Sequence, residues 1–480
     1  MPKTVQKTLS FPLAGVKRMG SYRRQERPYA APWAMNVRGG GALEGRVRGG
    51  SRPGLVNSGS VTVSTQDVWQ WPNGATIQWP DASSLNFDYL VKRSIVSGTT
   101  YLVDPSATID NATSTGDAPP NATVNCIYRD RVIKCKNNIW YASRMGDYTD
   151  WDYGANGKDV ARAVSGTIEL AGQSGLGGSV HTGLDITAAI PFRDKFVIFA
   201  TANKLRILNG DPTEGSITTL DEDIGIIAPY GWAFNNEDLA FLSNDGVYIG
   251  KIGSRPVRFS EDRIPGQLKN VDVSANTVTM AYDPGARGFH LFITPASGTG
   301  EHYFLDVDKK AIWPVTFGDD GHQPVSAARV KSESLERVIV EGRDGTWREF
   351  DDSATSDDDG TAIESHVLIG PIRMASDDMQ DALLAELHGI IAVGSANVTW
   401  RVVVDDTAEA AVDAAVADIV LVQAGSPTVS SDATGTWVAG RNYVTRPRAR
   451  GAWLVVWISS TGAWAYEAVA FKARQLGRLR

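Results

Sequence analysis

The chain has 480 residues, of which 42% are apolar, and its formal net charge is −8. This length suffices for roughly two to four domains with cores of their own. Two cysteines, Cys126 and Cys135, are too few for a disulfide framework and are expected to be buried thiols. No apolar run approaches the roughly 18 residues of a membrane helix, and residues 1–13 lack the apolar stretch of a signal peptide, so we expect synthesis in a reducing cytoplasm.

The charge is distributed unevenly along the chain. Residues 1–54 carry 11 Lys or Arg against 2 Asp or Glu, and residues 441–480 carry 8 against 1. The residues between them hold 28 basic and 52 acidic side chains, a net charge of −24. Two interpretations remain open: the basic ends fold back onto the acidic body of their own chain, or they contact acidic surfaces of neighbouring subunits.

Residues 1–55 are predicted to form an extended basic arm, because they are rich in Gly and Pro and lack a periodic apolar pattern. At its end, Gly49, Gly50 and Gly54 are expected to allow close backbone approach or a positive φ. Arginine forms bidentate pairs with carboxylates at interfaces. The candidates for subunit contacts are the arm residues Arg38, Arg46, Arg48 and Arg52, and near the other end of the chain Arg446, Arg448 and Arg450.

Residues 56–350 are predicted to be β-structure, because short runs rich in β-branched and aromatic residues alternate with Gly, Asn and Asp turns. Turns near residues 137, 202, 244, 308 and 344 lie about 65, 42, 64 and 36 residues apart, and an aromatic residue often follows the turn. This recurrence is typical of small stacked sheets and favours an irregular β-propeller with insertions over unrelated β-meanders. The predicted hairpins pair residues 131–136 with 139–143, 195–201 with 204–208, 239–243 with 247–252, 303–307 with 311–317, and 337–341 with 346–350.

Residues 351–360 are acidic and lack large apolar side chains, so they are predicted to be a linker. Beyond it, residues 361–480 are expected to form a β-sandwich-like domain with a basic edge. Its predicted strands are residues 363–372, 398–404 and 452–458, and residues 408–416 are either one short helix or an exposed loop.

The sequence contains no recognised catalytic, cofactor-binding or metal-binding motif. Its Gly-rich runs match neither a dinucleotide fingerprint nor a P-loop, and its six histidines are isolated from one another. Asp147, Asp150 and Asp152 are compatible with a glycosidase pair or a Ca²⁺ loop, and residues 351–359 with loose Ca²⁺ binding. We favour solvated acidic turns in both places and expect no enzymatic activity, no cofactor and no metal.

An ordered series of short motifs resembles the tail nozzle proteins of short-tailed bacteriophages, the family called tail tubular protein B. The likeness covers roughly residues 10–270, with only a loose likeness beyond. The motifs are Leu13-Ala14-Gly15-Val16, Pro28, Pro32, Asn36-Val37, the run 46–55, Gly146-Asp147-Tyr148-Thr149-Asp150-Trp151, Asn209-Gly210-Asp211-Pro212, Ile224-Gly225-Ile226-Ile227, Ser243-Asn244-Asp245-Gly246-Val247-Tyr248, Phe259-Ser260 and Ile264-Pro265-Gly266-Gln267-Leu268.

The resemblance implies a structural virion protein with a β-propeller fold. It implies a homo-oligomeric ring, a hexamer, at the distal end of the tail, enclosing a channel through which genomic double-stranded DNA leaves without tight binding. Its implied partners are the tail adaptor and other tail proteins, with host-surface contact at the tail tip. Such a protein is made in the host cytoplasm and resides in the virion.

Two other functions compete with the nozzle or hub ring. One is a tail-associated propeller that binds or cleaves glycans, which predicts facing carboxylates and exposed Trp in a concave site. The other is a neck or adaptor protein of similar fold. A DNA-binding role for the basic ends is disfavoured, since no basic stripe alternates with aromatic residues and the body is acidic.

Overall fold

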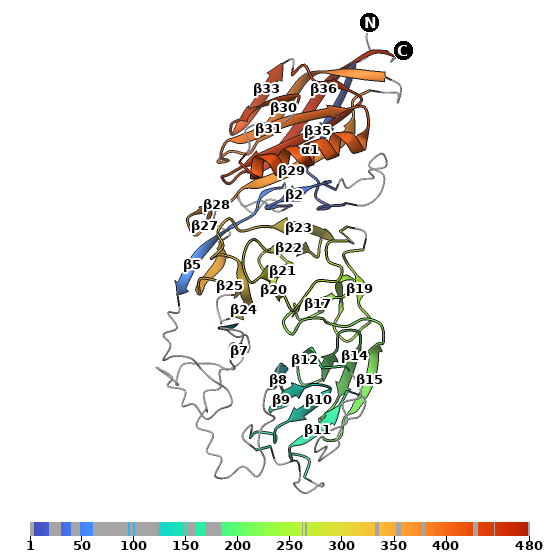
Figure 1. Ribbon diagram of the computed structural model, residues 1–480, viewed down its shortest axis with the longest axis vertical. Coiled ribbons are helices and arrows are strands. Elements are labelled where there is room, and N and C mark those ends of the chain that lie inside the picture. Colours follow the sequence, from blue (N-terminus) through green and yellow to red (C-terminus); the bar gives the residue numbers. More distant parts are fainter. Residues whose placement is uncertain are drawn as a thin grey trace.

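The computed structural model gives an elongated molecule with a propeller-like body and a second domain at one end, where both chain termini lie (Figure 1). No helix among the described residues is long and apolar enough to cross a membrane. The structure describes residues 4–18, 30–39, 49–60, 95–96, 99–100, 122, 124–147, 150–151, 153, 159–168, 184–261, 263–264, 266–331, 336–351, 357–375, 380–425, 431–445 and 447–478.

Five antiparallel sheets form the propeller-like body, and four of them are built from four strands consecutive in sequence. The first holds β8 (Val124–Tyr128), β9 (Arg131–Lys136), β10 (Ile139–Ala142) and β11 (Val164–Thr167). The second holds β12 (Ala188–Phe192), β13 (Phe196–Ala200), β14 (Leu205–Asn209) and β15 (Ser216–Asp221). The third holds β16 (Trp232–Phe234), β17 (Asp238–Ser243), β18 (Gly246–Lys251) and β19 (Val257–Arg258), and the fourth β20 (Asn276–Asp283), β21 (Gly288–Pro295), β22 (Glu301–Asp306) and β23 (Ala311–Val315).

The fifth sheet is completed by the N-terminal part of the chain. It contains β24 (Pro324–Lys331), β25 (Glu336–Gly342) and β26 (Thr346–Asp351), and its fourth strand is β5 (Gly54–Ser60). The short strands β27 (Asp357–Asp358) and β28 (Thr361–Ala362) extend it beyond β5. The segment that begins at Gly54 is therefore the fourth strand of the last sheet of the body, although it comes from the N-terminal part of the chain.

The prediction of an all-β, propeller-like fold is confirmed, and each predicted hairpin lies within a different one of the five sheets. The uneven turn spacing has a simple cause. In four sheets the predicted turn joins the second and third strands, whereas the turn near residue 308 joins the third and fourth strands of its sheet. The equivalent turn of that sheet contains Gly298. When the turn at Gly298 is counted in place of the turn near residue 308, the spacing between equivalent turns is more regular than the sequence pattern indicated.

The second domain consists of two packed sheets and one helix. One sheet runs β1 (Thr4–Leu9), β36 (Tyr466–Arg478), β30 (Gln380–Ile391), β33 (Gly440–Thr445), with β34 (Arg450–Gly451) also paired to β30. The other runs β2 (Ala34–Met35), β29 (Ser365–Arg373), β35 (Trp453–Ser460), β31 (Val398–Asp405), β32 (Ala433–Trp437). The helix α1 (Ala408–Gln423) covers the outer face of the sheet that contains β29, β35 and β31. Thr407 caps the helix by accepting the Ala410 N–H.

The helix alternative for residues 408–416 is thus confirmed, although α1 continues to Gln423 through a β-branched run. The prediction of a two-sheet domain misses its two longest strands, β30 and β36. Both are rich in Ala and Leu, residues that favour helices, and are strands because one face packs against the opposite sheet. Two further pairs complete the described strands, β3 (Val37–Arg38) with β4 (Gly50–Ser51) and β6 (Ile95–Val96) with β7 (Thr99–Thr100).

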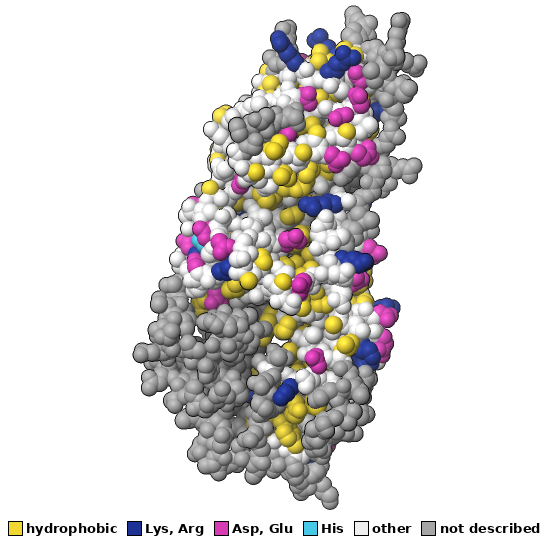
Figure 2. All heavy atoms as spheres, viewed as in Figure 1, with side chains coloured by type: hydrophobic (Ala, Val, Ile, Leu, Met, Phe, Trp, Pro, Cys, Tyr) yellow, Lys and Arg dark blue, Asp and Glu magenta, His cyan; other side chains and the backbone are white. Residues whose placement is uncertain are grey.

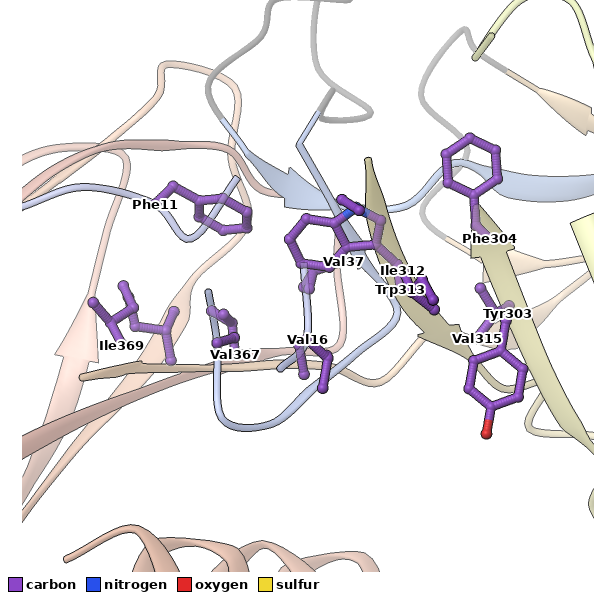
Figure 3. Packing of buried hydrophobic residues seen from close by; sticks show 14 of the residues in the cluster. Phe11, Val16, Val37, Tyr303, Phe304, Ile312, Trp313, Val315, Val367 and Ile369 are labelled. Atoms are coloured by element: carbon purple, nitrogen blue, oxygen red, sulfur yellow. The ribbon is translucent and has the colours of Figure 1, made fainter. Parts of the chain in front are cut away.

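The N-terminal segment joins the two domains instead of extending away from them. Val16 donates its N–H to Ile312 O at 2.9 Å in the propeller-like body, and strand β1 of the same N-terminal segment pairs with β36 in the second domain. Phe11 is buried between the domains, with its ring 5.9 Å from that of Trp313 (Figure 3). The Phe11 ring also lies 5.6 Å from the ring of Tyr466. We call the described residues 4–18, 30–39 and 49–60 the strap.

The strap requires glycine at residues 49 and 50, where its backbone lies against the backbone of Trp464 and Ala465. Gly49 has φ +82°, and Gly50 lies so close to the Trp464 carbonyl that a Cβ atom there would clash with it and stand 2.9 Å from Ala465 Cα. The expected roles of Gly49 and Gly50 are thereby confirmed. The boundary expected at residue 55 and the linker expected at 351–360 are not separations in the structure, because β5, β26 and β27 belong to one sheet.

Replacing Gly50 with alanine is expected to lower the free energy of unfolding by about 1–3 kcal/mol, because backbone atoms cannot move aside as a side chain can. Gly266→Ala is the matched control, since a Cβ atom at Gly266 meets nothing within 4 Å. Urea titration followed by tryptophan fluorescence measures both variants. Equal losses in the two variants would show that the approach to Trp464 is not tight in solution.

Candidate functional site

Arg52 of the strap lies in the interior, and all five of its N–H groups are used. Nε donates to Asn36 Oδ1 at 3.0 Å, and Nη1 donates to Pro53 O and to Asp358 Oδ1, both at 2.8 Å. Nη2 donates to Thr316 O at 3.0 Å and to Asp358 Oδ2. The guanidinium and carboxylate thus form a bidentate pair at 1% exposure, whose desolvation cost is offset only because every donor is satisfied.

Asn36 and Asp358 connect this pair to both domains. The Asn36 side-chain amide donates to Glu364 O at 2.8 Å and to Thr316 Oγ1 at 2.9 Å. Asp358 Oδ1 also accepts the Leu55 N–H at 3.2 Å. Because Asp358 belongs to the predicted acidic linker, this arginine follows the first interpretation of the charge pattern, in which the basic end folds onto its own chain.

The expected subunit contacts of Arg38 and Arg52 are corrected by this arrangement. Both side chains are buried within the chain, and Arg38 lies over the Phe304 ring with its Cζ 4.0 Å from the centroid. Arg448 is exposed, and Arg450 is 60% exposed while pairing with Asp381 Oδ2 at 3.1 Å, so these two remain available to a partner. The candidates Arg46, Arg48 and Arg446 lie outside the described residues.

A buried histidine lies near Arg38. His290 Nε2 is 3.2 Å from Asp283 Oδ2, and the His290 ring stacks on Phe350 at 4.4 Å. Burial lowers the pKa of His290 to about 4 despite the Asp283 carboxylate. For Asp283, burial alone would raise the pKa, but the hydrogen bond with His290 and the charge of Arg38 outweigh it and lower the pKa to about 2. A second interior histidine, His302, has its pKa lowered to about 4 by burial.

These pKa values predict that stability falls as the pH is lowered from about 6.5 to about 4. In that window the unfolded chain binds protons at His290 and His302 and the folded chain does not, so acid favours unfolding. Across this pH window, each of the two histidines is expected to lower the free energy of unfolding by on the order of 3 kcal/mol. Urea unfolding at several pH values measures the effect, and we expect His302→Gln to depend less on pH than the wild type. His388→Gln is the control, because His388 is only half-buried. An unchanged pH dependence in His302→Gln would contradict the prediction.

A cavity of about 330 Å³ lies where the first strands of the five sheets meet. Its wall takes residues from β8, β12, β16, β20 and β24, which come from all five sheets. The sheets are therefore arranged around one axis, as the blades of a propeller are. We call this space the axial cavity.

The wall of the axial cavity is mainly apolar and aromatic. Trp232, Phe234, Tyr230 and Tyr282 line it together with aliphatic, proline and cysteine side chains, and Asn125 adds one amide side chain. The charged group in the wall is Arg329, whose Nε and Nη2 atoms contact one oxygen of Glu336 and whose Cζ lies 5.2 Å from the Tyr282 ring centroid. No Asp or Glu is among the described residues of the wall, so the facing carboxylates that a glycosidase needs are not found there.

The acidic residues singled out in the sequence do not gather into a binding site as far as the structure describes them, which leaves out Asp152 and residues 352–356. Asp147 lies in a turn bridged to Arg144, Asp150 accepts the Arg144 N–H through its backbone carbonyl, and Asp152 lies outside the described residues. Among the residues that the structure describes, no group of three or more His, Cys, Asp or Glu could hold a metal ion. Cys126 and Cys135 are buried free thiols, as expected.

Two of the motifs behind the phage resemblance, those at residues 209–212 and 243–248, include turns that contact a neighbouring sheet. Tyr128 donates its hydroxyl to Gly210 O at 2.8 Å, and Arg131 Nη2 lies 3.4 Å from Asp211 Oδ1, which connects the first sheet to the second. Asn244 donates to Ala202 O at 3.2 Å, which connects the third sheet to the second.

Two further motifs have backbone roles. At Gly225 a Cβ atom would clash with the backbone of residues 201–203, where the chain passes from the second sheet to the third. The hydroxyl of Ser260 accepts the Val247 N–H at 3.1 Å and so holds the end of the third sheet. These motif residues position backbone in the turns between sheets.

Charged side chains of both signs lie on the visible face. Several Lys and Arg lie at the end of the molecule where both termini lie, with Asp and Glu close by, and over the rest of the face both kinds of charge are interspersed (Figure 2). The described basic residues of that end include Lys7, Arg450, Lys472 and Arg474, all from the sheet that contains β1 and β36. These residues come from the first strand β1, from β34 and from the last strand β36.

No family model matches the chain, and no curated protein sequence matches it. Solved structures similar to it include the extracellular domain of a hybrid two-component system from B. thetaiotaomicron, with 11% identity and a TM-score of 0.30, covering 47% of this chain and 26% of that one. U3-55K has 8% identity and a TM-score of 0.27, covering 54% and 87%, and the Mitotic Checkpoint Complex has 10% and 0.28, covering 47% and 61%. The chain spans about a quarter of the first of these, and these similarities identify neither a family nor a function.

Proposed function

We propose that this protein is a structural component of the tail of a tailed bacteriophage, a distal nozzle or hub ring through which DNA is ejected. The observation that carries the proposal is the role of the motif residues: Asp211 and Asn244 connect neighbouring sheets, and Gly225 and Ser260 position the backbone at the ends of sheets. A sequence likeness made of such residues is a likeness of architecture, as a scaffold requires, and implies no catalytic site.

In this proposal the DNA channel lies between copies of the chain. The volume of the axial cavity, about 330 Å³, is that of a sphere about 9 Å across, which is less than the width of about 12 Å of the major groove of DNA alone, so a duplex does not fit inside it. A ring, a hexamer in this proposal, encloses a wider opening. The acidic residues of the body suit a lumen that repels phosphate, because Lys and Arg contacts to phosphates would hold the DNA.

The basic end of the second domain then serves contacts with neighbours, which include the tail adaptor and other tail proteins. Arg448 and Arg450 remain candidates for these contacts, because they are exposed and lie beside the basic sheet edge. The glycan-cleaving alternative has no support from the axial cavity, whose described wall lacks a carboxylate.

Native mass spectrometry of the full chain, alone and with tail components, tests the ring, and immunogold labelling of purified particles tests its position. We expect a closed homo-oligomer and label at the distal end of the tail. Arg448→Glu is expected to weaken the ring and Arg287→Glu, a control on an exposed turn of the propeller, to leave it intact. A monomer at high concentration with tail components present, and particles without label, would contradict the proposal.

A further inference from the structure

We propose that the axial cavity binds a small ligand with an apolar, preferably aromatic, body and one carboxylate, which pairs with Arg329. This site goes beyond the structural role in the tail and does not depend on it. Its volume of about 330 Å³ is at the lower end of the range for small-molecule sites, about 300–1,000 Å³.

The composition of the wall selects the body of the ligand. Trp232, Phe234 and Tyr282 offer aromatic surface, and Ile127, 44% exposed, faces the same space. The indole N–H of Trp232 is already bonded to Pro229 O at 2.9 Å, so that ring presents an apolar surface to a ligand. The larger part of the wall is apolar, and water against that part has few hydrogen-bond partners, so an apolar ligand body displaces it favourably.

Arg329 selects the charge of the ligand. One edge of its guanidinium, Nε and Nη2, is held by a single oxygen of Glu336, while Nη1 has no hydrogen-bond partner among the described residues. Its side chain is 19% exposed and remains in contact with the Tyr282 ring, so the guanidinium is held in place before a ligand arrives. A guanidinium can pair with two carboxylates through its two edges. The second edge of the guanidinium is therefore a site for an acceptor oxygen. A carboxylate oxygen forms a stronger hydrogen bond there than a neutral acceptor does.

Two sources supply this chemistry, a free aryl-alkyl acid and the carboxyl terminus of a peptide that ends in an apolar residue. Isothermal titration calorimetry on the full chain compares 4-phenylbutyrate with its amide, and a short peptide ending in Phe with the same peptide amidated at its C-terminus. We expect each acid to bind at least about tenfold more tightly than its amide, the value of one charge-assisted hydrogen bond. Tighter binding of the free-acid peptide than of 4-phenylbutyrate identifies a protein terminus as the natural ligand, and the reverse identifies a metabolite.

Arg329→Met is expected to abolish the preference for the acid, while Arg287→Met, an exposed arginine paired with Asp308, leaves it unchanged. If Arg329→Met fails to fold, Ala328→Leu, which adds bulk to the cavity wall, is expected to lower the affinity for both acids. Equal binding of acid and amide, binding of a neutral saccharide in place of the acids, or no binding at all would overturn the proposal. Each of these results leaves the ring and its place in the particle untouched, because those are measured separately.

Discussion

Replacing Arg52 with methionine is expected to lower the free energy of unfolding by about 3–5 kcal/mol, because it leaves the Asp358 carboxylate buried without its partner. Three other acceptors of the site, on Asn36, Pro53 and Thr316, lose a donor at the same time. Chemical denaturation monitored by circular dichroism and tryptophan fluorescence measures the loss.

The double variant Arg52→Met with Asp358→Leu separates the ion pair from the packing around it. Removing both charges leaves no unpaired carboxylate, so we expect the double variant to lose less stability than the two single variants summed. Arg287→Met provides the surface control. Its pair with Asp308 is 71% and 52% exposed and is expected to contribute about 1 kcal/mol or less. If Arg52→Met is as stable as Arg287→Met, the buried pair of Arg52 and Asp358 does not stabilise the fold as its hydrogen bonds indicate.

Truncating Phe11 to alanine is expected to cost about 3–5 kcal/mol, the range for a buried aromatic residue. Phe11 is 5% exposed and touches Trp313 of the propeller-like body and Tyr466 of the second domain, so the cavity left behind opens between the two domains. The Tyr466 hydroxyl, which donates to Leu9 O, holds the strap beside this cavity and limits its collapse.

Differential scanning calorimetry measures this variant, and we expect a lower midpoint together with weaker coupling between the domains. Tyr443→Ala is the matched aromatic control, because Tyr443 is 55% exposed and its loss leaves no interior cavity. A midpoint for Phe11→Ala equal to that of Tyr443→Ala would mean that the strap does not carry the contact between the domains.

Local patterns predicted the elements of the body well. The hairpin from Arg131 to Ala142 was found almost to the residue, because alternating β-branched strands around an Asn-Asn turn specify a hairpin locally. The second domain was predicted less well. β30 and β36 are composed of residues that favour helices, and only their pairing with each other and their packing against the other sheet decide their conformation.

The candidate functional site was likewise predicted only in part from the sequence. Arg52 stood out in the sequence as an arginine suited to carboxylate pairing, but its partner Asp358 lies 306 positions away, and an acidic run looks the same whether it is solvated or buried. The axial cavity gave no local signal at all. Its wall takes one strand from each of five sheets, between residues 124 and 329, and none of those strands is unusual by itself.

By itself, the sequence determined the all-β class, the hairpins of the body, the glycines at 49 and 50 and the charge asymmetry of the chain. These follow from short-range rules, which are backbone sterics, the two-residue period of strands and turn chemistry. Only the tertiary structure decided what the basic N-terminal segment does: it is a strap that pairs with β36, completes the fifth sheet with β5 and buries Arg52 against Asp358. The reason is physical, since a segment without an apolar period has no core of its own and takes its conformation from the surfaces it joins.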